Sequence, residues 1–217
     1  MKTLRDFVSR SLCLVILLPA LAVAGELKPI ELPAPQTTGG MPLMQALKAR
    51  HSTREFSPQK LPLQVLSNLL WAAFGVNRPE TGKRTAPSAM NWQEIDIYVA
   101  TADGLYVYDA KGNKLDPVLG EDVRAATGTQ SYVGEAALNL VYVADLAKVS
   151  HADGEDRIMW TAADAGLIAQ NVYLFCASEG LNVVVRGSVD RPALAKIMRL
   201  RPDQKIILAQ TVGYPRT

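Results

Sequence analysis

Hydrophobic residues recur at three- and four-residue spacing in four segments of the chain, the pattern of a helix with one apolar face. This pattern predicts helices over residues 42–50, 62–74, 161–180 and 190–200. In the first helix, Leu43, Met44 and Leu47 share one face. Gly180 is expected to end the third helix, and Asp190 is the expected N-cap of the fourth.

Between the helices, short runs of β-branched and aromatic residues predict strands. Residues 95–109 indicate a hairpin that turns at Asp103-Gly104. Residues 137–146 indicate a strand that is apolar on both faces and therefore central, and two more strands are predicted over 182–187 and 205–215. The order of helices, hairpin, strand, helix, strand, helix and strand predicts an α+β domain with a mostly antiparallel central sheet flanked by helices.

Two segments lack such a pattern. Residues 25–41 are rich in proline and contain a glycine pair, which predicts an extended segment without helix, either loose or laid along another surface. Residues 77–93 are polar and rich in turn formers, which predicts a loop. Residues 42–217 are long enough to form one domain with a sizeable core.

Residues 1–24 have the three parts of a secretory signal peptide. A positively charged start precedes the apolar run SLCLVILLPALAVA, and Ala22 and Ala24 form a cleavage motif before Gly25. The alternative is an uncleaved membrane anchor, for which the apolar run is short. We therefore expect a periplasmic or secreted protein without stable membrane insertion once the signal is removed.

Composition and charge exclude several classes of protein. Hydrophobic residues make up 48% and charged residues 20% of the chain, as in an ordinary globular protein. Cleavage would remove three of the 23 basic and one of the 21 acidic residues, which leaves a neutral chain with no general attraction for nucleic acid. Cys176 would remain as a single cysteine, and His51 and His151 lack metal-ligand spacing, so no metal site is predicted.

The first candidate site is the polar run RHSTR, which follows the first predicted helix. Arg50 and Arg54 offer planar guanidinium groups suited to phosphate or carbonyl oxygens. His51 and Ser52 lie between them, and the serine adds a hydroxyl donor. Taken alone, the run is equally consistent with a solvated helix end stabilised by the helix dipole.

Two further polar clusters interrupt the apolar pattern. In RTAPSAMNWQ, Pro87 and Ser88 set a turn, and Asn91 can both donate and accept hydrogen bonds, which suits an imide-like edge. In VVRGSVD, a strand stops at Arg186 and Gly187, where the glycine lets a flat ligand approach the backbone. Ordinary polar loops and strand–helix junctions share both patterns, so neither cluster identifies a ligand alone.

Several motifs together resemble the FMN-dependent nitroreductase superfamily. RHSTREF resembles its opening motif, and LLWAAFGVNRPETGKRTAPSAMNWQEIDIYVA with GLYVYD resembles specifically its SagB-type branch. DAGLIAQNVYLFCASEGLNVVVRG is similar to the interface helix of the superfamily and the strand after it, and VGYP matches the terminal strand. The similarity covers residues 43–215, with the motifs in the expected order.

The resemblance implies a nitroreductase-like fold and an intertwined homodimer with two FMN sites, each built from both subunits. It implies that Arg50 and Ser52 bind the FMN phosphate. Arg54 should face the N1/O2 edge of the isoalloxazine, and the Gly187 amide should approach N5. Further positions in the matched motifs complete the implied cofactor-binding set: His51, Arg186, Arg216 and, from the other subunit, Pro87, Ser88 and Asn91.

Small residues on the third predicted helix suggest where two subunits meet. Ala162, Ala165, Gly166 and Ala169 recur at three- and four-residue spacing, and small side chains let two helices approach closely. We therefore expect the dimer interface along Ala162–Glu179.

The chain departs from the SagB-type pattern in three places. Ala89-Met90 follow Pro87-Ser88 where relatives often have PSAG. The Lys-Tyr pair of azoline-oxidising relatives is absent from HADGEDRIMW, which argues against azoline oxidation. The chain ends at YPRT, so Arg216 alone is left to do what a longer basic tail does in relatives.

These features predict an exported FMN oxidoreductase that transfers hydride from a small-molecule donor to an electron-poor acceptor of the nitroaromatic, quinone or enone type. Flavin N5 carries the chemistry, so no catalytic side chain is expected. A flavin-binding or degenerate dimer without turnover is the alternative, because nicotinamide donors are scarce outside the cytoplasm. A purely structural periplasmic module is the third possibility.

Overall fold

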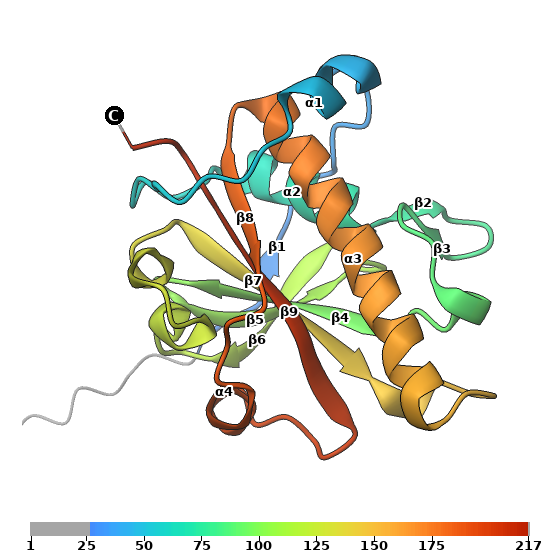
Figure 1. The fold of residues 1–217 in the computed structure, drawn as a ribbon. Coiled ribbons are helices and arrows are strands. Elements are labelled where there is room, and N and C mark those ends of the chain that lie inside the picture. The colour runs from blue at the N-terminus through green and yellow to red at the C-terminus, as the bar shows by residue number, and fades with distance from the viewer. Residues whose placement is uncertain (1–26, 217) are drawn as a thin grey trace, which may run out of the picture.

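Helices lie on both faces of one large antiparallel sheet in the computed structural model, which describes residues 27–216 (Figure 1). The signal peptide predicted over residues 1–24 lies outside the described residues. Four α-helices are described: α1 (Leu43–Ala49), α2 (Leu63–Phe74), α3 (Gly154–Glu179) and α4 (Arg191–Ile197). Four short 3₁₀ helices accompany them: η1 (Ala89–Asn91), η2 (Arg124–Thr127), η3 (Ser131–Gly134) and η4 (Leu146–Lys148).

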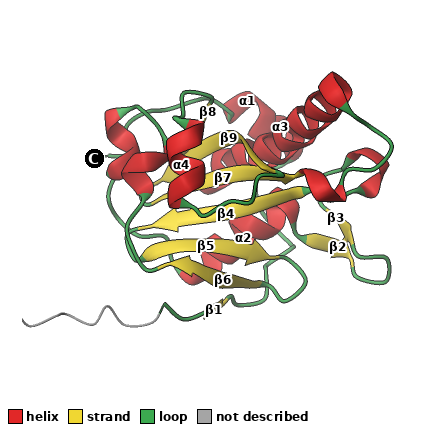
Figure 2. Ribbon diagram, turned by 90° about the horizontal axis from the view of Figure 1, so that it is seen from below, coloured by secondary structure: helices red, strands yellow, loops and turns green. Residues whose placement is uncertain are grey.

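The strands form one sheet of seven and a separate small hairpin. The sheet has the order β1 (Ile30–Glu31), β6 (Lys114–Leu119), β5 (Gly104–Asp109), β4 (Ile95–Thr101), β7 (Leu138–Asp145), β9 (Gln204–Gly213), β8 (Asn182–Arg186), visible in Figure 2. The hairpin pairs β2 (Val76–Arg78) with β3 (Lys83–Arg84). Every neighbouring pair in the sheet is antiparallel, which confirms the predicted fold class.

The sheet is apolar on both faces because its central strands alternate between two cores. In β7, Leu140 and Tyr142 belong to the core under α2 and α3, whereas Val141 and Val143 belong to the core under α4. All eight residues of β7 are buried, as its continuous apolar sequence predicts. The sheet is therefore enclosed between α2 and α3 on one side and α4 with η2 on the other.

Helix α3 begins at Gly154, seven residues before the predicted start at 161. Its first turns carry large apolar side chains that are exposed, so the usual sign of a helix with a buried face is missing there. The negative charges of Glu155 and Asp156 in the first turn interact favourably with the helix dipole. The predicted end is confirmed, because Gly180 caps the helix in the left-handed conformation with φ 68°.

The N-terminal segment lies along the sheet and covers its edge. β1 pairs with β6 through Ile30 and Leu115, and residues 27–42 contain no helix. The sequence pattern does not predict β6 as a strand, because Pro117 is unusual in a sheet. A register shift between Leu105 and Tyr106 of β5 lies opposite this proline and accommodates it.

One other local prediction needs correction, and one apolar helix face is unexpectedly exposed. The segment predicted as a plain polar loop contains the β2–β3 hairpin and η1. The face of α1 formed by Leu43, Met44 and Leu47 is not buried in the protomer: these side chains are 63%, 76% and 43% exposed. Of the residues of α1, only Ala46 is buried. No helix among residues 27–216 is long and apolar enough to span a membrane.

Candidate functional site

The polar run after α1 lies against the edge strand β8. The Thr53 amide donates to the Val183 carbonyl at 3.0 Å, and the Val183 amide donates to Thr53 Oγ1 at 3.2 Å. Asn182 Nδ2 donates to the Glu55 carbonyl at 2.6 Å. These bonds fix the backbone of residues 50–55 at the edge of the sheet. The side chains of this run that take no part in these bonds face outward.

Tyr173 of α3 joins this run to β8. Its hydroxyl oxygen accepts a hydrogen bond from the Val185 amide at 2.9 Å and lies 2.7 Å from Ser52 Oγ. The Arg50 guanidinium stacks over the Tyr173 ring, 5.3 Å from its centroid, in a cation–π contact. Sequence reasoning missed Tyr173, although it is a hydroxyl-bearing residue within the apolar run NVYLFC.

The structure brings Arg50, His51, Ser52 and Arg54 together on one outward-facing segment. Arg50 is half-buried, and the other three are exposed. His51 Nδ1 lies 2.6 Å from the Ala49 carbonyl at the end of α1. Arg216 reaches the same segment from the end of the chain, where its Nε donates to the carbonyl of Phe56 at 3.2 Å and its guanidinium pairs with Glu135.

Arg186 and Gly187 lie at the end of β8, and they face different surroundings. Arg186 is 4% exposed, and it donates to Thr211 Oγ1, Asn139 Oδ1 and the oxygens of Thr127 at 2.8–3.4 Å. Burial lowers the pKa of its guanidinium to about 10. Gly187 is exposed, and a Cβ added there would meet nothing within 4 Å. The Arg186 side chain thus points into the protein, and Gly187 presents open backbone.

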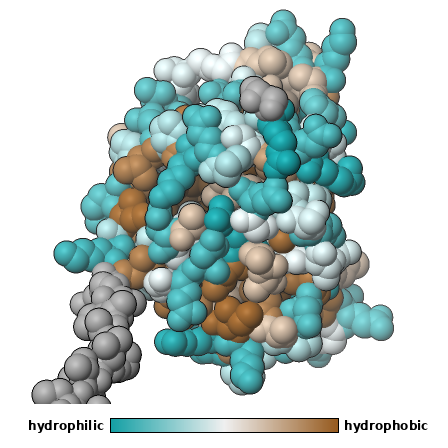
Figure 3. All heavy atoms as spheres, turned by 90° about the vertical axis from the view of Figure 1, so that its left-hand side faces the viewer, coloured by the Kyte–Doolittle hydropathy of each residue, from teal (hydrophilic) through white to brown (hydrophobic). Residues whose placement is uncertain are grey.

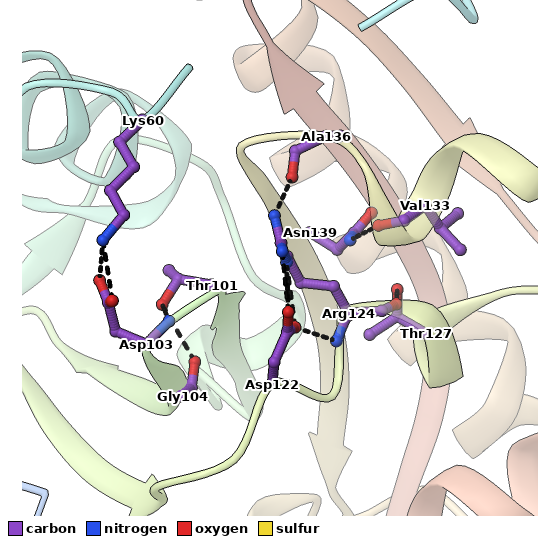
Figure 4. A network of polar contacts seen from close by, with 10 residues as sticks. All are labelled: Lys60, Thr101, Asp103, Gly104, Asp122, Arg124, Thr127, Val133, Ala136 and Asn139. Atoms are coloured by element: carbon purple, nitrogen blue, oxygen red, sulfur yellow. Dashed lines mark hydrogen bonds and ion pairs between the residues drawn. The ribbon is translucent and has the colours of Figure 1, made fainter. Parts of the chain in front are cut away.

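The surroundings of Arg186 are built around its guanidinium. A Cβ at Gly128 would lie 1.8 Å from Arg186 Nη1, so glycine is required there. Asn139 is held by a bond from its Nδ2 to the Val133 carbonyl at 2.7 Å, and Arg124 bonds the Ala136 carbonyl and Asp122 nearby (Figure 4). Among the described residues, no carboxylate forms an ion pair with Arg186. A buried positive charge therefore lies beside Gly187.

The loop that carries Pro87, Ser88 and Asn91 is tightly folded and strained. Met90, Asn91 and Gln93 have φ of 50°, 56° and 50°, a left-handed conformation that costs energy for residues other than glycine. Ser88 Oγ accepts from the Gln93 amide at 2.9 Å and closes the turn. Pro87, Met90 and Asn91 face outward, and Met90 is 75% exposed.

Two buried carboxyl groups lie beneath this loop. Ser88 Oγ donates to Glu94 Oε2 at 3.0 Å, and the Ala89 amide donates to Asp164 Oδ2 of α3 at 2.8 Å. Glu94 is fully buried and Asp164 is 4% exposed. Burial, together with repulsion from Asp164, raises the pKa of the Glu94 carboxyl to about 7.

Within one protomer the two polar regions do not meet. The RHSTR segment contacts α3 at Tyr173, and the 87–91 loop contacts it at Asp164. Nine residues of helix separate these contacts, which is roughly 13 Å along the axis. A hollow of about 610 Å³ between α2, α3 and residues 36–41 is lined by none of the predicted site residues. A smaller one of about 200 Å³ is lined by Pro87, Ser88 and Asn91.

One face of α3 is apolar and uncovered around its contact with the 87–91 loop. Met159, Leu167 and Trp160 are 53%, 44% and 45% exposed, and Gly166 is also exposed. On the side of the molecule that lies to the left in Figure 1, hydrophobic side chains form separate patches among hydrophilic ones (Figure 3).

The predicted interface stripe needs correction: Ala165 and Ala169 are buried against the protein's own sheet, and only Ala162 and Gly166 face outward. Among the described residues, no group of three or more metal-ligating side chains is placed to hold a metal ion.

Comparison with known proteins matches most of this chain. A model of the nitroreductase family matches residues 47–214. A protein of Methanocaldococcus jannaschii named as a nitroreductase is 30% identical over 169 residues, which cover 73% of this chain and 85% of that protein. A crystal structure of a Ralstonia eutropha protein described as a nitroreductase superposes with a TM-score of 0.85 at 47% identity, over 92% of this chain and 94% of that one.

The fold is also found in a protein of lower sequence identity. A chain of the E. coli microcin synthetase McbBCD complex, crystallised with truncated pro-MccB17, superposes with a TM-score of 0.67 at 20% identity. The match covers 98% of this chain and 85% of that one. At this identity the likeness shows the fold alone.

Proposed function

Because this chain belongs to the nitroreductase family, whose members are flavin-dependent oxidoreductases, we propose that it is an exported FMN-dependent oxidoreductase acting on small electron-poor molecules. The observation that carries the proposal is the cluster of Arg50, Ser52 and Tyr173 beside the open backbone of Gly187. This cluster has the chemistry of a phosphate site next to a surface that accepts a flat ring.

The donor set at one end of the site fits a phosphate group. Arg50 offers a guanidinium whose orientation is fixed by stacking on Tyr173, so little side-chain freedom would be lost on binding. Ser52 offers a hydroxyl held by the Tyr173 hydroxyl, and His51 is exposed on the same segment. Arg216 adds a further positive charge near Phe56, although it is paired with Glu135.

The other end of the site fits the isoalloxazine ring. Arg54 is exposed and would face the N1/O2 edge, where a positive charge favours the more negative reduced state of the cofactor. Gly187 leaves room for the ring to approach its amide, and the buried Arg186 charge lies behind it. When bound, FMN supplies hydride chemistry at N5, and these side chains bind it, orient it and set its charge environment.

We propose that Pro87, Ser88 and Asn91 of a partner subunit complete the site. The exposed apolar faces of α1 and α3 carry large side chains that a partner would cover, and both lie next to the RHSTR segment or the loop. If two copies of α3 pack antiparallel, the Asp164 end of one helix lies near the Tyr173 end of the other. A homodimer with two shared sites is therefore supported by the places where each region contacts α3.

The proposed acceptor class is compatible with the side chains of the site. Among the candidate site residues there is no His–Asp pair or nucleophile placed for acid–base or covalent catalysis, and Cys176 is buried with its pKa raised by burial. We propose nitroaromatics, quinones or enones as acceptors, because a reduced flavin supplies the hydride chemistry without a catalytic side chain. The residue pattern that argues against azoline oxidation supports this choice.

Spectroscopy of the purified mature protein tests the proposal. We expect a yellow protein with an FMN-like spectrum, released FMN on heating, and bleaching by dithionite and by at least one biological donor, followed by reoxidation with a quinone or nitroaromatic. Bleaching by dithionite without turnover with any acceptor would instead identify a flavin-binding dimer. Protein that is colourless and does not bind added FMN would contradict the proposal.

A further inference from the structure

The loop from Ser88 to Gln93 is held from below by two carboxyl groups that belong to distant parts of the chain. Glu94 precedes β4, and Asp164 lies on α3. Each accepts one hydrogen bond from the loop: Glu94 Oε2 from the Ser88 hydroxyl at 3.0 Å, and Asp164 Oδ2 from the Ala89 amide at 2.8 Å. These two bonds connect the strained loop to the sheet and to the helix at once.

The strain in the loop requires such an anchor. Met90, Asn91 and Gln93 all have positive φ, a conformation that is energetically unfavourable for residues other than glycine. A loop of this kind persists only where the surrounding structure determines it. The bonds to Glu94 and Asp164 supply that determination for Ser88 and Ala89.

The second oxygen of Glu94 favours a protonated carboxyl group in this arrangement. Glu94 Oε1 is buried, and none of residues 27–216 offers it a donor, which is unfavourable for an ionised carboxylate. Asp164 is its charged neighbour, and two buried carboxylates repel each other. A proton on Glu94 lowers both costs, because it neutralises the carboxyl group and lets it donate a hydrogen bond to Asp164.

Four other charged groups on the surrounding elements form hydrogen bonds or ion pairs elsewhere. Asp145 of β7 pairs with Arg201, and Asp96 of β4 pairs with Lys148. Arg84 of β3 donates to Gln93 Oε1 and to the Phe74 carbonyl. Arg157 of α3 donates to the carbonyls of Ala152 and Val149. None of these cations is bonded to Glu94 or Asp164, so the carboxyl pair has no counter-ion among the described residues.

We propose that Glu94 and Asp164 are positioning residues that hold one proton between them and fix the loop from Ser88 to Gln93 in the conformation that faces the flavin. Ionisation of both carboxyl groups pushes them apart and releases the loop. The role toward flavin rests on the proposed function, whereas the anchoring of the loop does not. The pair therefore makes cofactor binding at the loop sensitive to pH.

Hydrogen exchange in FMN-free protein tests the anchor. We expect the protection factor of the Ala89 amide to fall about tenfold or more between pH 5.5 and pH 8.5 in the wild-type protein. In Asp164→Asn, the amide oxygen still accepts the bond from Ala89, and the amide nitrogen can donate to Glu94, so no shared proton is needed. The Ala89 amide of this variant should therefore remain protected at both pH values. Asp164→Ala should be unprotected at both.

Two further variants sharpen the comparison. Glu94→Gln is isosteric and cannot ionise, so its loop should show no pH-dependent loss of protection. This variant keeps the test decisive if Asp164→Ala fails to fold. Asp156→Asn, an exposed carboxylate on the same helix, should behave like the wild-type protein. Protection in the wild-type protein that does not change with pH, or that falls equally in Glu94→Gln, would overturn the proposal.

Titration of the same variants with FMN separates the anchor from the proposed function. We expect the FMN dissociation constant of the wild-type protein to rise with pH about as much as loop protection falls, and that of Glu94→Gln to stay constant. Hydrogen exchange that changes with pH as expected, in a protein that does not bind FMN, would support the anchor and contradict the flavin role. FMN binding with identical pH dependence in wild type and Glu94→Gln would overturn the positioning role.

Discussion

Among single residues, the two arginines of RHSTR are expected to have different effects. Arg50 is stacked on Tyr173 and is proposed to grip the phosphate, which has the same charge in oxidised and reduced FMN. Arg50→Ala should weaken FMN binding by about 1.5–3 kcal/mol, or roughly 10- to 150-fold, with little change in midpoint potential. FMN titration and spectroelectrochemistry of the variant measure both quantities.

Arg54 provides the contrast, because it is proposed to face the part of the ring whose charge changes. Arg54→Ala should lower the midpoint potential of bound FMN while weakening oxidised FMN less than Arg50→Ala does. Lys60→Ala, which removes an exposed ion pair with Asp103, serves as a control and should change neither quantity. Equal potential shifts in both arginine variants would contradict the different roles proposed for them, and no effect of either change on FMN would show that RHSTR is only a polar helix end.

Arg186 illustrates a residue whose type and position in the sequence do not reveal where its side chain points. Its guanidinium satisfies buried oxygens of Thr127, Asn139 and Thr211. Arg186→Met should destabilise the protein by about 3 kcal/mol or more, because buried acceptors left without donors cost about 1–3 kcal/mol each. Chemical denaturation measures the loss, and Arg191→Met, whose side chain is exposed, is expected to cost clearly less.

Among the elements, helix α3 carries the test of the dimer. A Cβ at Gly166 meets nothing within 4 Å in the protomer, so Gly166→Arg should leave the fold intact. In the proposed dimer the same side chain would project into the partner subunit and separate the two helices. Light scattering should therefore give a dimer for the wild-type protein and a monomer for Gly166→Arg, with circular dichroism unchanged.

A matched control places the same side chain on a different helix. Ala193→Arg changes an exposed position on α4, on the opposite side of the sheet from α3, and should remain dimeric. A monomeric wild-type protein at micromolar concentration, or a dimer that tolerates Gly166→Arg, would contradict the proposed interface.

The carboxyl pair beneath the loop predicts how stability changes with pH. The pKa of Glu94 is about 7 in the folded protein against an ordinary value of 4.5, so the folded state binds more protons between these values. Its contribution to the free energy of unfolding is fully present below about pH 4.5 and is lost as pH rises to 7 and above. Denaturant titrations between pH 5 and 8.5 should show this decrease in the wild-type protein and a smaller slope in Glu94→Gln.

For the molecule as a whole, the location in which the protein works depends on whether residues 1–24 direct its export. If residues 1–24 are a signal peptide, the mature chain begins at Gly25 and is recovered from the periplasmic fraction or the medium. Intact-mass measurement of that protein should give the mass of residues 25–217. A soluble cytosolic pool that retains Met1–Ala24 would contradict export and would restore cytosolic nicotinamide donors as the simplest source of electrons.

Local sequence pattern was sufficient to predict the elements whose side chains repeat with a clear period. The alternating pattern of residues 95–109 predicts the β4–β5 hairpin, and the continuous apolar run of β7 predicts a strand buried on both faces. Gly180 and Asp190 mark helix ends correctly, because caps depend on neighbouring backbone groups only. Motifs in a fixed order along the chain were also enough to identify the family, which the match over residues 47–214 confirms.

What each polar or apolar side chain faces was settled by tertiary packing instead. Period could not show that the apolar face of α1 is exposed, that Arg186 is buried, or that Tyr173 meets Ser52, 121 residues away. Nor could it join Glu94 to Asp164, since each looks like an ordinary surface carboxylate in the sequence. The physical reason is that period reports the geometry of one element, whereas burial and hydrogen bonding depend on which distant segments of the chain pack together.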